Sequence, residues 1–248
     1  MQEPLAQRLV ARGNRVFALD LLGHGDSDRP EGSGHYSISR FADQAIALLD
    51  HLGLEQAVLG GTSLGANVSL EAATRYPERV RALVLEMPVL DDSQLAASAI
   101  FTPMGLSFRF GAPALRPLTR LVRLLPRGAA RAGHVGNLVD TLLDWVSQDP
   151  AHAANVLVGL AYGRTAPPRE EREQLEMPAL IIAHSGDPIH ALADAKAAAR
   201  DLPNSELVRA RTFFEMRFSP GRLADEVAEF LERWWESQPT TRSVSRIS

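Results

Sequence analysis

The segment Gly61-Thr62-Ser63-Leu64-Gly65 decides the fold. An apolar run at 56–60 with the length of a buried strand precedes it, and a helical pattern follows it up to Tyr76, where Pro77 prevents the helix from continuing. A serine between two glycines at such a junction is typical of a strained strand-to-helix turn, where larger flanking side chains would collide with the neighbouring strand and helix. We therefore predict a tight turn that lifts the Ser63 hydroxyl above the end of a sheet.

The same turn places the backbone N–H of Leu64 at the N-terminus of a helix. The first amides of a helix have no partner within it, and the helix dipole is positive there. Leu64 is thus a candidate donor to the oxyanion that forms when Ser63 attacks a carbonyl. The alternative interpretation is a purely structural serine turn, because the G-x-S-x-G pattern also occurs by chance.

Outward from this segment, apolar runs alternate with helical patterns. The further strand candidates lie at 15–20, 81–86, 178–183 and 206–210. The helix candidates lie at 3–12, at about 41–52 with Ser39 or Ser37 as its cap, at 64–76 and at 219–235. Strands that are apolar along their whole length are typical of a parallel sheet covered by helices on both faces. The pattern predicts an α/β fold.

Residues 91–172 interrupt this alternation. The stretch is rich in proline and arginine, is helical where it is periodic and contains no strand pattern, so we interpret it as an insertion over the sheet. The part at 113–125 favours a lid for an apolar substrate or an ordinary packing helix over a helix lying on a membrane surface. Its apolar side comprises Leu115, Leu118, Leu121, Val122 and Leu125, and its basic side Arg116, Arg120 and Arg123.

Composition narrows the possible partners. The chain has 248 residues, 45% of them hydrophobic and 23% charged, with a net charge of -4 and no cysteine. The charge gives no indication of nucleic acid binding, and disulfides, thiolate catalysis and zinc–thiolate sites are excluded. No apolar run approaches the roughly 20 residues of a membrane span, and the first residues have no signal-peptide pattern. We expect a cytoplasmic protein that acts on a small molecule, away from membranes and without a metal or cofactor.

The Ser63 segment, the turn Gly23-His24-Gly25-Asp26-Ser27 and the Gly186-Asp187-Pro188 sequence together resemble the α/β-hydrolase superfamily over residues 1–90 and 175–236. Its members are mostly esterases, lipases, lactonases, epoxide hydrolases, dehalogenases and related enzymes. The resemblance implies a mostly parallel sheet flanked by helices. With the broken alternation and the polar C-terminal stretch, it predicts four regions: the first part of the core (1–90), a helical cap (91–172), the second part of the core (173–237) and a disordered tail (238–248).

Asp187 follows an apolar strand, where the resemblance places the carboxylate of a catalytic triad. Such a carboxylate holds an imidazole in one tautomer and stabilises its charged form. Asp187 is otherwise a turn aspartate before a proline. Glu86, at the end of its own strand, is a second possible acid, because some relatives carry the carboxylate there.

The general base is the difficulty. The family order is serine, acid, histidine, yet no histidine follows His190, and the position that normally holds it is occupied by Phe213. His190 lies only three residues after Asp187, and we expect so local a pair hardly to reproduce the usual Asp–His–Ser line. We interpret His24 as a structural turn residue. The insertion offers His134 and His152, which a lid would have to lower onto Ser63.

Relatives also begin with further strands, the last of which carries a backbone N–H for the oxyanion and lies centrally in the sheet. We hypothesise that this chain is truncated at its N-terminus.

Two functions follow. The first is a carboxylesterase-like serine hydrolase acting on a small apolar ester or related acyl substrate, with Ser63 as nucleophile, Leu64 N–H as oxyanion donor and Asp187 orienting the base. The alternative is a hydrolase-fold protein that has lost catalysis and binds a small apolar ligand, which the phenylalanine at 213 favours.

Overall fold

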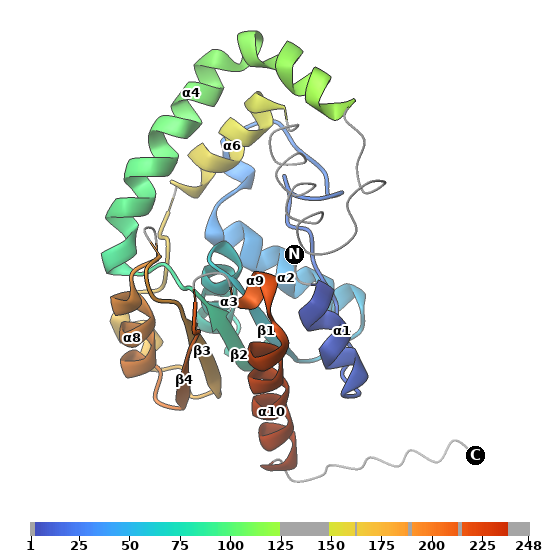
Figure 1. The fold of residues 1–248 in the computed structure, drawn as a ribbon, viewed down its shortest axis with the longest axis vertical. Helices are drawn as coiled ribbons and strands as arrows, with labels where there is room; N and C mark the ends of the chain where they lie inside the picture. The colour runs from blue at the N-terminus through green and yellow to red at the C-terminus, as the bar shows by residue number, and fades with distance from the viewer. Residues whose placement is uncertain (1–2, 125–148, 162, 188–189, 213–214, 238–248) are drawn as a thin grey trace, which may run out of the picture.

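The computed structural model describes residues 3–124, 149–161, 163–187, 190–212 and 215–237 (Figure 1). Its centre is a sheet of four parallel strands in the order β1-β2-β3-β4. The strands are β1 (Ala57–Thr62), β2 (Val80–Glu86), β3 (Ala179–Ala183) and β4 (Ser205–Arg209). Four of the five predicted strands are therefore confirmed, within one or two residues at each end.

Helices cover both faces of the sheet, as the apolar strands predicted. On β2, Leu83 and Leu85 point toward α3 (Leu64–Arg75) and α8 (Leu192–Asp201), while Ala82 and Val84 point toward α1 (Glu3–Ala11) and α10 (Gly221–Ser237). Side chains alternate between the two faces of a strand, so β2 needs apolar residues at every position to serve two cores. These layers form the predicted α/β architecture.

The helix α2 (Ile38–His51) begins at Ser37, whose side chain accepts a hydrogen bond from the Arg40 N–H. It packs on α3 through a small separate apolar cluster that contains Ile46 and Leu49. The remaining short elements are η1 (Ser33–His35), η2 (Pro77–Arg79), α7 (Arg169–Arg172) and α9 (Glu215–Phe218).

The predicted strand at 15–20 was wrong. These residues join no ladder in the described part of the chain, and Phe17 and Leu19 are 42% and 39% exposed. An apolar segment becomes a strand only where a neighbour accepts its backbone hydrogen bonds, and the one partner of β1 in the described sheet is β2. Propensity alone therefore overstated the strand.

The insertion is helical, as expected. It contains α4 (Asp91–Arg123), which arches over α6 (Pro150–Leu160) in Figure 1. Val156 and Leu160 of α6 pack with Leu64 and Val68 of α3. The cap therefore rests on the helix that follows Ser63. The region boundaries at 90, 172 and 237 remain predictions, and the tail at 238–248 lies outside the described residues.

The apolar side predicted at 113–125 is largely exposed rather than packed. Leu118 is 54% exposed and Leu121 62%, whereas Thr119 between them is buried. Leu125 lies outside the described residues. None of the helices within the described ranges is both long enough and apolar enough to cross a membrane.

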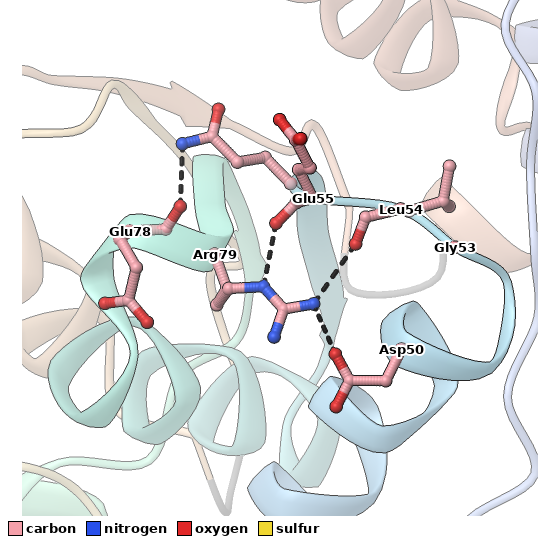
Figure 2. Close-up of a pocket in the computed structure, with 7 residues that line it drawn as sticks. Asp50, Gly53, Leu54, Glu55, Glu78 and Arg79 are labelled. Atoms are coloured by element: carbon pink, nitrogen blue, oxygen red, sulfur yellow. Dashed lines mark hydrogen bonds and ion pairs between the residues drawn. The ribbon is translucent and has the colours of Figure 1, made fainter.

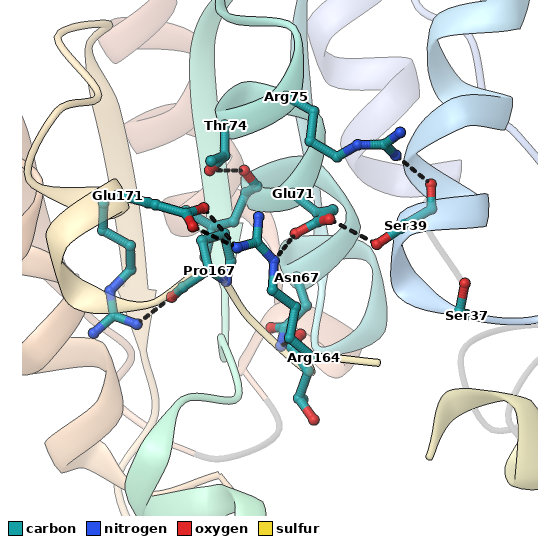
Figure 3. Close-up of polar contacts among 12 residues, drawn as sticks. Ser37, Ser39, Asn67, Glu71, Thr74, Arg75, Arg164, Pro167 and Glu171 are labelled. Carbon is teal, nitrogen blue, oxygen red and sulfur yellow. Dashed lines mark hydrogen bonds and ion pairs between the residues drawn. The ribbon is translucent and has the colours of Figure 1, made fainter. Parts of the chain in front are cut away.

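Two buried polar residues of α3, Asn67 and Glu71, hold chain segments next to the two ends of the insertion, and Figure 3 shows the Glu71 contacts with Arg164 and Ser39. The Asn67 amide bonds both backbone groups of Val89, two residues before the insertion, and donates to the Thr165 carbonyl near its end. One helical turn further on, Glu71 accepts from Arg164 at 2.8 Å and from Ser39 at 2.7 Å. Since Asn67 and Glu71 are 1% and 2% exposed, these bonds replace hydration that burial removed.

A groove lies at the N-terminal end of β1 (Figure 2), whereas Ser63 follows the C-terminal end of that strand. Its guanidinium, Arg79, donates to Asp50 and to the carbonyls of Leu54 and Glu55. These bonds join the loop before β1 to the turn before β2, so the polar groups of the groove have a structural role.

Candidate active site

Ser63 occupies the predicted strained turn between β1 and α3. Its backbone has φ 53° and ψ −108°, which is unusual for a residue other than glycine. The Ser63 N–H donates to the Glu86 carbonyl at 2.8 Å, and the Ser63 carbonyl accepts from the Asn67 N–H at 3.0 Å. The turn is thus fixed from both sides, which offsets its strain.

The two flanking glycines have different roles. A Cβ on Gly61 would lie 2.7 Å from the Cα and C atoms of Gly65, so a side chain at 61 collides with backbone. A Cβ on Gly65 would meet nothing within 4 Å. The predicted collision is therefore confirmed at Gly61 and wrong at Gly65, because only the Gly61 position points into the bend.

The structure brings Ser63, His190 and Asp187 into one hydrogen-bonded line. His190 Nε2 lies 2.8 Å from Ser63 Oγ, and His190 Nδ1 lies 2.6 Å from Asp187 Oδ2. The expectation that so local a pair hardly reproduces this line was wrong. The backbone N–H of His190 also donates to Asp187 Oδ1 at 3.0 Å, so the backbone and the ring of His190 both bond to one carboxylate while the other ring nitrogen faces Ser63.

Burial and hydrogen bonding select the tautomer that a general base needs. The Asp187 side chain is 1% exposed and that of His190 16%. A carboxylate only accepts, so the Nδ1 atom beside it carries the proton and Nε2 presents its lone pair to the Ser63 hydroxyl. This geometry allows Ser63 to lose its proton to His190 as the oxygen attacks.

Leu64 is the first residue of α3, as predicted. Its N–H belongs to the first helical turn, whose amides have no acceptor within the helix. The positive end of the helix dipole is there too, so an oxyanion next to Ser63 Oγ would be stabilised by both.

Glu86, the second possible acid, has a different set of neighbours. One of its oxygens accepts from the Thr62 hydroxyl, and Oε1 lies 2.9 Å from Nε2 of buried His184, whose Nδ1 is 3.3 Å from the Thr212 carbonyl. Burial raises the pKa of Glu86, but the contacts with His184 and Thr62 and the charges of His184 and Arg217 outweigh it and hold the pKa below its usual value. Glu86 therefore steadies the residue before Ser63.

The other candidate histidines lie elsewhere. The His24 ring packs edge-on against Phe41 at 6.0 Å and its Nδ1 lies 3.1 Å from the Leu22 carbonyl, which agrees with a structural turn residue. His152 is on α6, and the geometry assigns the contact with Ser63 to His190 instead. His134 and Phe213 lie outside the described residues. The described ranges hold no cluster of three or more acidic or histidine side chains suited to a metal ion.

Sequence reasoning undervalued His190 and did not see the Glu86–His184 pair. The signal for His190 was its place three residues after Asp187, at the edge of the sheet where the strands end at their carboxyl sides. No signal in the sequence joined Glu86 to His184, because the two residues come from strands about a hundred positions apart.

Comparison with known proteins places the chain in a family. A model of the alpha/beta hydrolase fold matches residues 1–215, and the chain belongs to that family. It is similar to a 2-hydroxymuconate semialdehyde hydrolase of Pseudomonas putida, 49% identical over 71 residues that make up 29% of this chain and 25% of that protein. A haloalkane dehalogenase of Mycolicibacterium paratuberculosis is 30% identical over 202 residues, 75% of this chain and 63% of that protein. The chain thus spans less than two thirds of these curated relatives.

Solved structures show the same fold at low sequence identity. The enol-lactonase from Burkholderia xenovorans is 20% identical and superposes with a TM-score of 0.68, covering 92% of this chain and 86% of that one. The fold and its helical insertion are thereby established.

Proposed function

We propose that this protein is a serine hydrolase of the esterase type, with Ser63 as nucleophile, His190 as general base and Asp187 as the orienting acid. The single observation that carries this proposal is the hydrogen-bonded line from Ser63 Oγ through both nitrogens of His190 to Asp187 Oδ2. A serine held in a strained turn, with an imidazole within 2.8 Å and a buried carboxylate behind it, has the geometry of an activated nucleophile.

The reaction follows from the proton positions. Nε2 of His190 takes the Ser63 proton while Oγ bonds to the substrate carbonyl carbon, and the Leu64 N–H donates to the resulting oxyanion. The imidazolium then gives its proton to the leaving oxygen as the acyl–oxygen bond breaks, which leaves an acyl-serine. Water repeats both steps and restores Ser63. Asp187 stays ionised and stabilises the imidazolium throughout.

The surroundings favour a small apolar acyl substrate. Val156 and Leu160 of the cap join Leu64, the residue next to Ser63, in one apolar cluster. The side chains that pack beside the proposed nucleophile are thus apolar, which is common next to small-molecule sites. The names of two similar proteins, a semialdehyde hydrolase and an enol-lactonase, agree with carbonyl chemistry.

The second candidate is a catalytically impaired protein that binds a small apolar ligand. It is favoured by Phe213, at the position where the family resemblance leads one to expect the histidine. The two functions differ in one measurable property, the reactivity of the Ser63 hydroxyl.

Labelling of the full chain with a fluorophosphonate probe separates the two. We expect wild-type protein to be labelled, with the adduct located on Ser63 by peptide mass spectrometry, and Ser63→Ala to be unlabelled. Ser69→Ala is the matched control, because it removes another α3 hydroxyl, one that donates to the Gly65 carbonyl, and should retain labelling. A folded wild-type protein that resists the probe would remove the enzyme and leave the binding protein.

A further inference from the structure

The residue after His190 is held by the cap. The Ala191 N–H donates to Ser93 Oγ at 2.7 Å, and Ser93 lies in the first turn of α4. Ala191 is also the residue from which α8 begins, and its carbonyl accepts from the Asp194 N–H at 3.0 Å. The backbone on the C-terminal side of the proposed base is therefore fastened to a helix of the insertion.

Asp194 makes the reverse connection, from a side chain of α8 to the backbone of α4. Its carboxylate, on α8, accepts from the backbone N–H groups of Leu90 at 2.7 Å, Ser93 at 2.9 Å and Asp92 at 3.0 Å. The N-cap residue of α4, Leu90, supplies no side-chain cap of its own. A helix start leaves its first amides without partners, so a carboxylate from α8 completes the cap of α4. In Figure 1 the first turns of α4 lie against α8.

Together, the contacts of Ser93 and Asp194 form a clamp between α4 and α8, and both of its side chains are buried. Ser93 and Asp194 are each 1% exposed. A buried carboxylate is tolerated only where hydrogen bonds and favourable charge replace water, and here three N–H groups and the positive end of the α4 dipole do so. Movement of α4 away from α8 would expose or leave unpaired all of these groups together, so the clamp holds one arrangement.

The clamp is also connected to the nucleophile. The Asn67 side chain, in the first turn of α3, accepts a hydrogen bond from the Val89 N–H at 2.9 Å and donates one to the Val89 carbonyl at 2.7 Å. The chain from Val89 to Ser93 thus touches α3, which begins directly after Ser63, at one end and the loop that carries His190 at the other.

We propose that Ser93 and Asp194 are positioning residues for His190, so that the seating of the cap helix sets the alignment of the base with Ser63. The proposal rests on the proposed function for its catalytic meaning. It does not make either residue catalytic: Ser93 acts through the Ala191 backbone, and the Asp194 carboxylate acts through the start of α4 that carries Ser93. A chain of contacts between the clamp and His190 does not by itself show that the clamp aligns the base, so the test must separate alignment from simple stabilisation of the fold.

The experiment compares Ser93→Ala, Ser93→Thr and Asp194→Asn in the full chain. Asp194→Asn replaces one of the oxygens that accept from the start of α4, so we expect it to lower kcat in the same direction as Ser93→Ala, and an unchanged kcat would remove Asp194 from the proposal. We expect Ser93→Ala to lower kcat for p-nitrophenyl butyrate by about tenfold to a hundredfold with KM within twofold, since it loosens the base without removing apolar contacts. Ser93→Thr keeps the hydroxyl and should recover most of the rate. In a His190→Ala background, Ser93→Ala should cause no further fall, because the group that it positions is already gone.

Matched controls cover nonspecific effects. Ser205→Ala removes a hydroxyl that donates to the Ala199 and Leu202 carbonyls at the far end of α8, and Asp91→Asn removes an exposed carboxylate from the first turn of α4. Both should keep the wild-type rate. A Ser93→Ala effect of equal size with and without His190 would overturn the proposal and leave a purely structural clamp.

A second readout does not depend on activity. The Nδ1 proton of His190, hydrogen-bonded to Asp187, should give an NMR signal that His190→Ala removes. We expect Ser93→Ala to broaden or shift this signal and Ser93→Thr to restore it. An unchanged signal would overturn the positioning role, whereas a changed signal in protein that the fluorophosphonate does not label would refute only the proposed function.

Discussion

Replacement of Asp187 by asparagine tests the proposed triad most directly. Two donors of one residue converge on this carboxylate, the His190 N–H at Oδ1 and the His190 Nδ1–H at Oδ2. An asparagine has one oxygen and one NH₂ in these places. The backbone N–H cannot become an acceptor, so the amide oxygen must face it and the NH₂ must face the ring.

The magnitude follows from the tautomer. An NH₂ group opposite Nδ1 makes that nitrogen the acceptor and moves the ring proton to Nε2, the atom 2.8 Å from Ser63 Oγ. The imidazole then cannot take the serine proton. In a Ser–His–Asp triad the corresponding change lowers kcat about 10⁴-fold, which is roughly 5 kcal/mol of transition-state stabilisation. The side chain keeps its volume, so stability should change far less than activity.

The assay is the initial rate of p-nitrophenyl butyrate hydrolysis, with the second-order rate of fluorophosphonate labelling as an independent measure of nucleophile activation. Asp43→Asn is the matched control, since it weakens contacts with Arg75 and Tyr76, which lie at the end of α3 opposite Ser63. Its rate should equal that of wild type. A folded Asp187→Asn protein within tenfold of wild type by both measures would refute the assignment of Asp187 and the tautomer argument together.

Three further results are expected. Gly61→Ala should slow labelling of Ser63 at least tenfold, because its Cβ would meet Gly65 backbone at 2.7 Å, whereas Gly65→Ala, with free space, should change it less; equal effects would contradict this. Asp201→Ala should lower the free energy of unfolding in urea by about 3–5 kcal/mol, since it leaves the 3%-exposed Arg172 guanidinium buried without its carboxylate, and a loss under about 1 kcal/mol would count against it. The pKa of Glu86 is lower in the folded than in the unfolded chain, so its contribution to stability is complete above the unfolded value and is lost as pH falls through the folded one. The melting temperatures of wild type and Glu86→Gln should therefore converge on acidification, and a constant difference down to about pH 3 would refute that reading.

Local sequence patterns predicted the structure correctly wherever a residue's neighbours in sequence are also its neighbours in space. The turn at Ser63 was predictable because its strain, its small flanking residue and its helix dipole all arise within five positions. The strands β2 and β3 were predictable because burial on both faces demands apolar residues throughout. The segment at 15–20 has the same pattern but no partner in the described sheet, so its composition misled.

The base shows the opposite case. The family order of serine, acid and histidine predicted the base at position 213, and the short spacing between Asp187 and His190 argued against His190. The Asp187 carboxylate accepts from the His190 backbone N–H and contacts the His190 ring, however, and the other ring nitrogen faces Ser63. No periodicity encodes this arrangement, because it depends on a side chain accepting from a backbone amide three residues later.

The sequence by itself determined the layered α/β fold, the serine turn and the carboxylate at 187, because each depends on short-range sterics and on the burial of apolar residues. Only the tertiary structure decided which histidine meets Ser63 and that buried polar groups of α3 and α8 hold the cap. Those contacts join residues up to 127 positions apart, and hydrogen bonds between distant side chains form only after the sheet has brought them together.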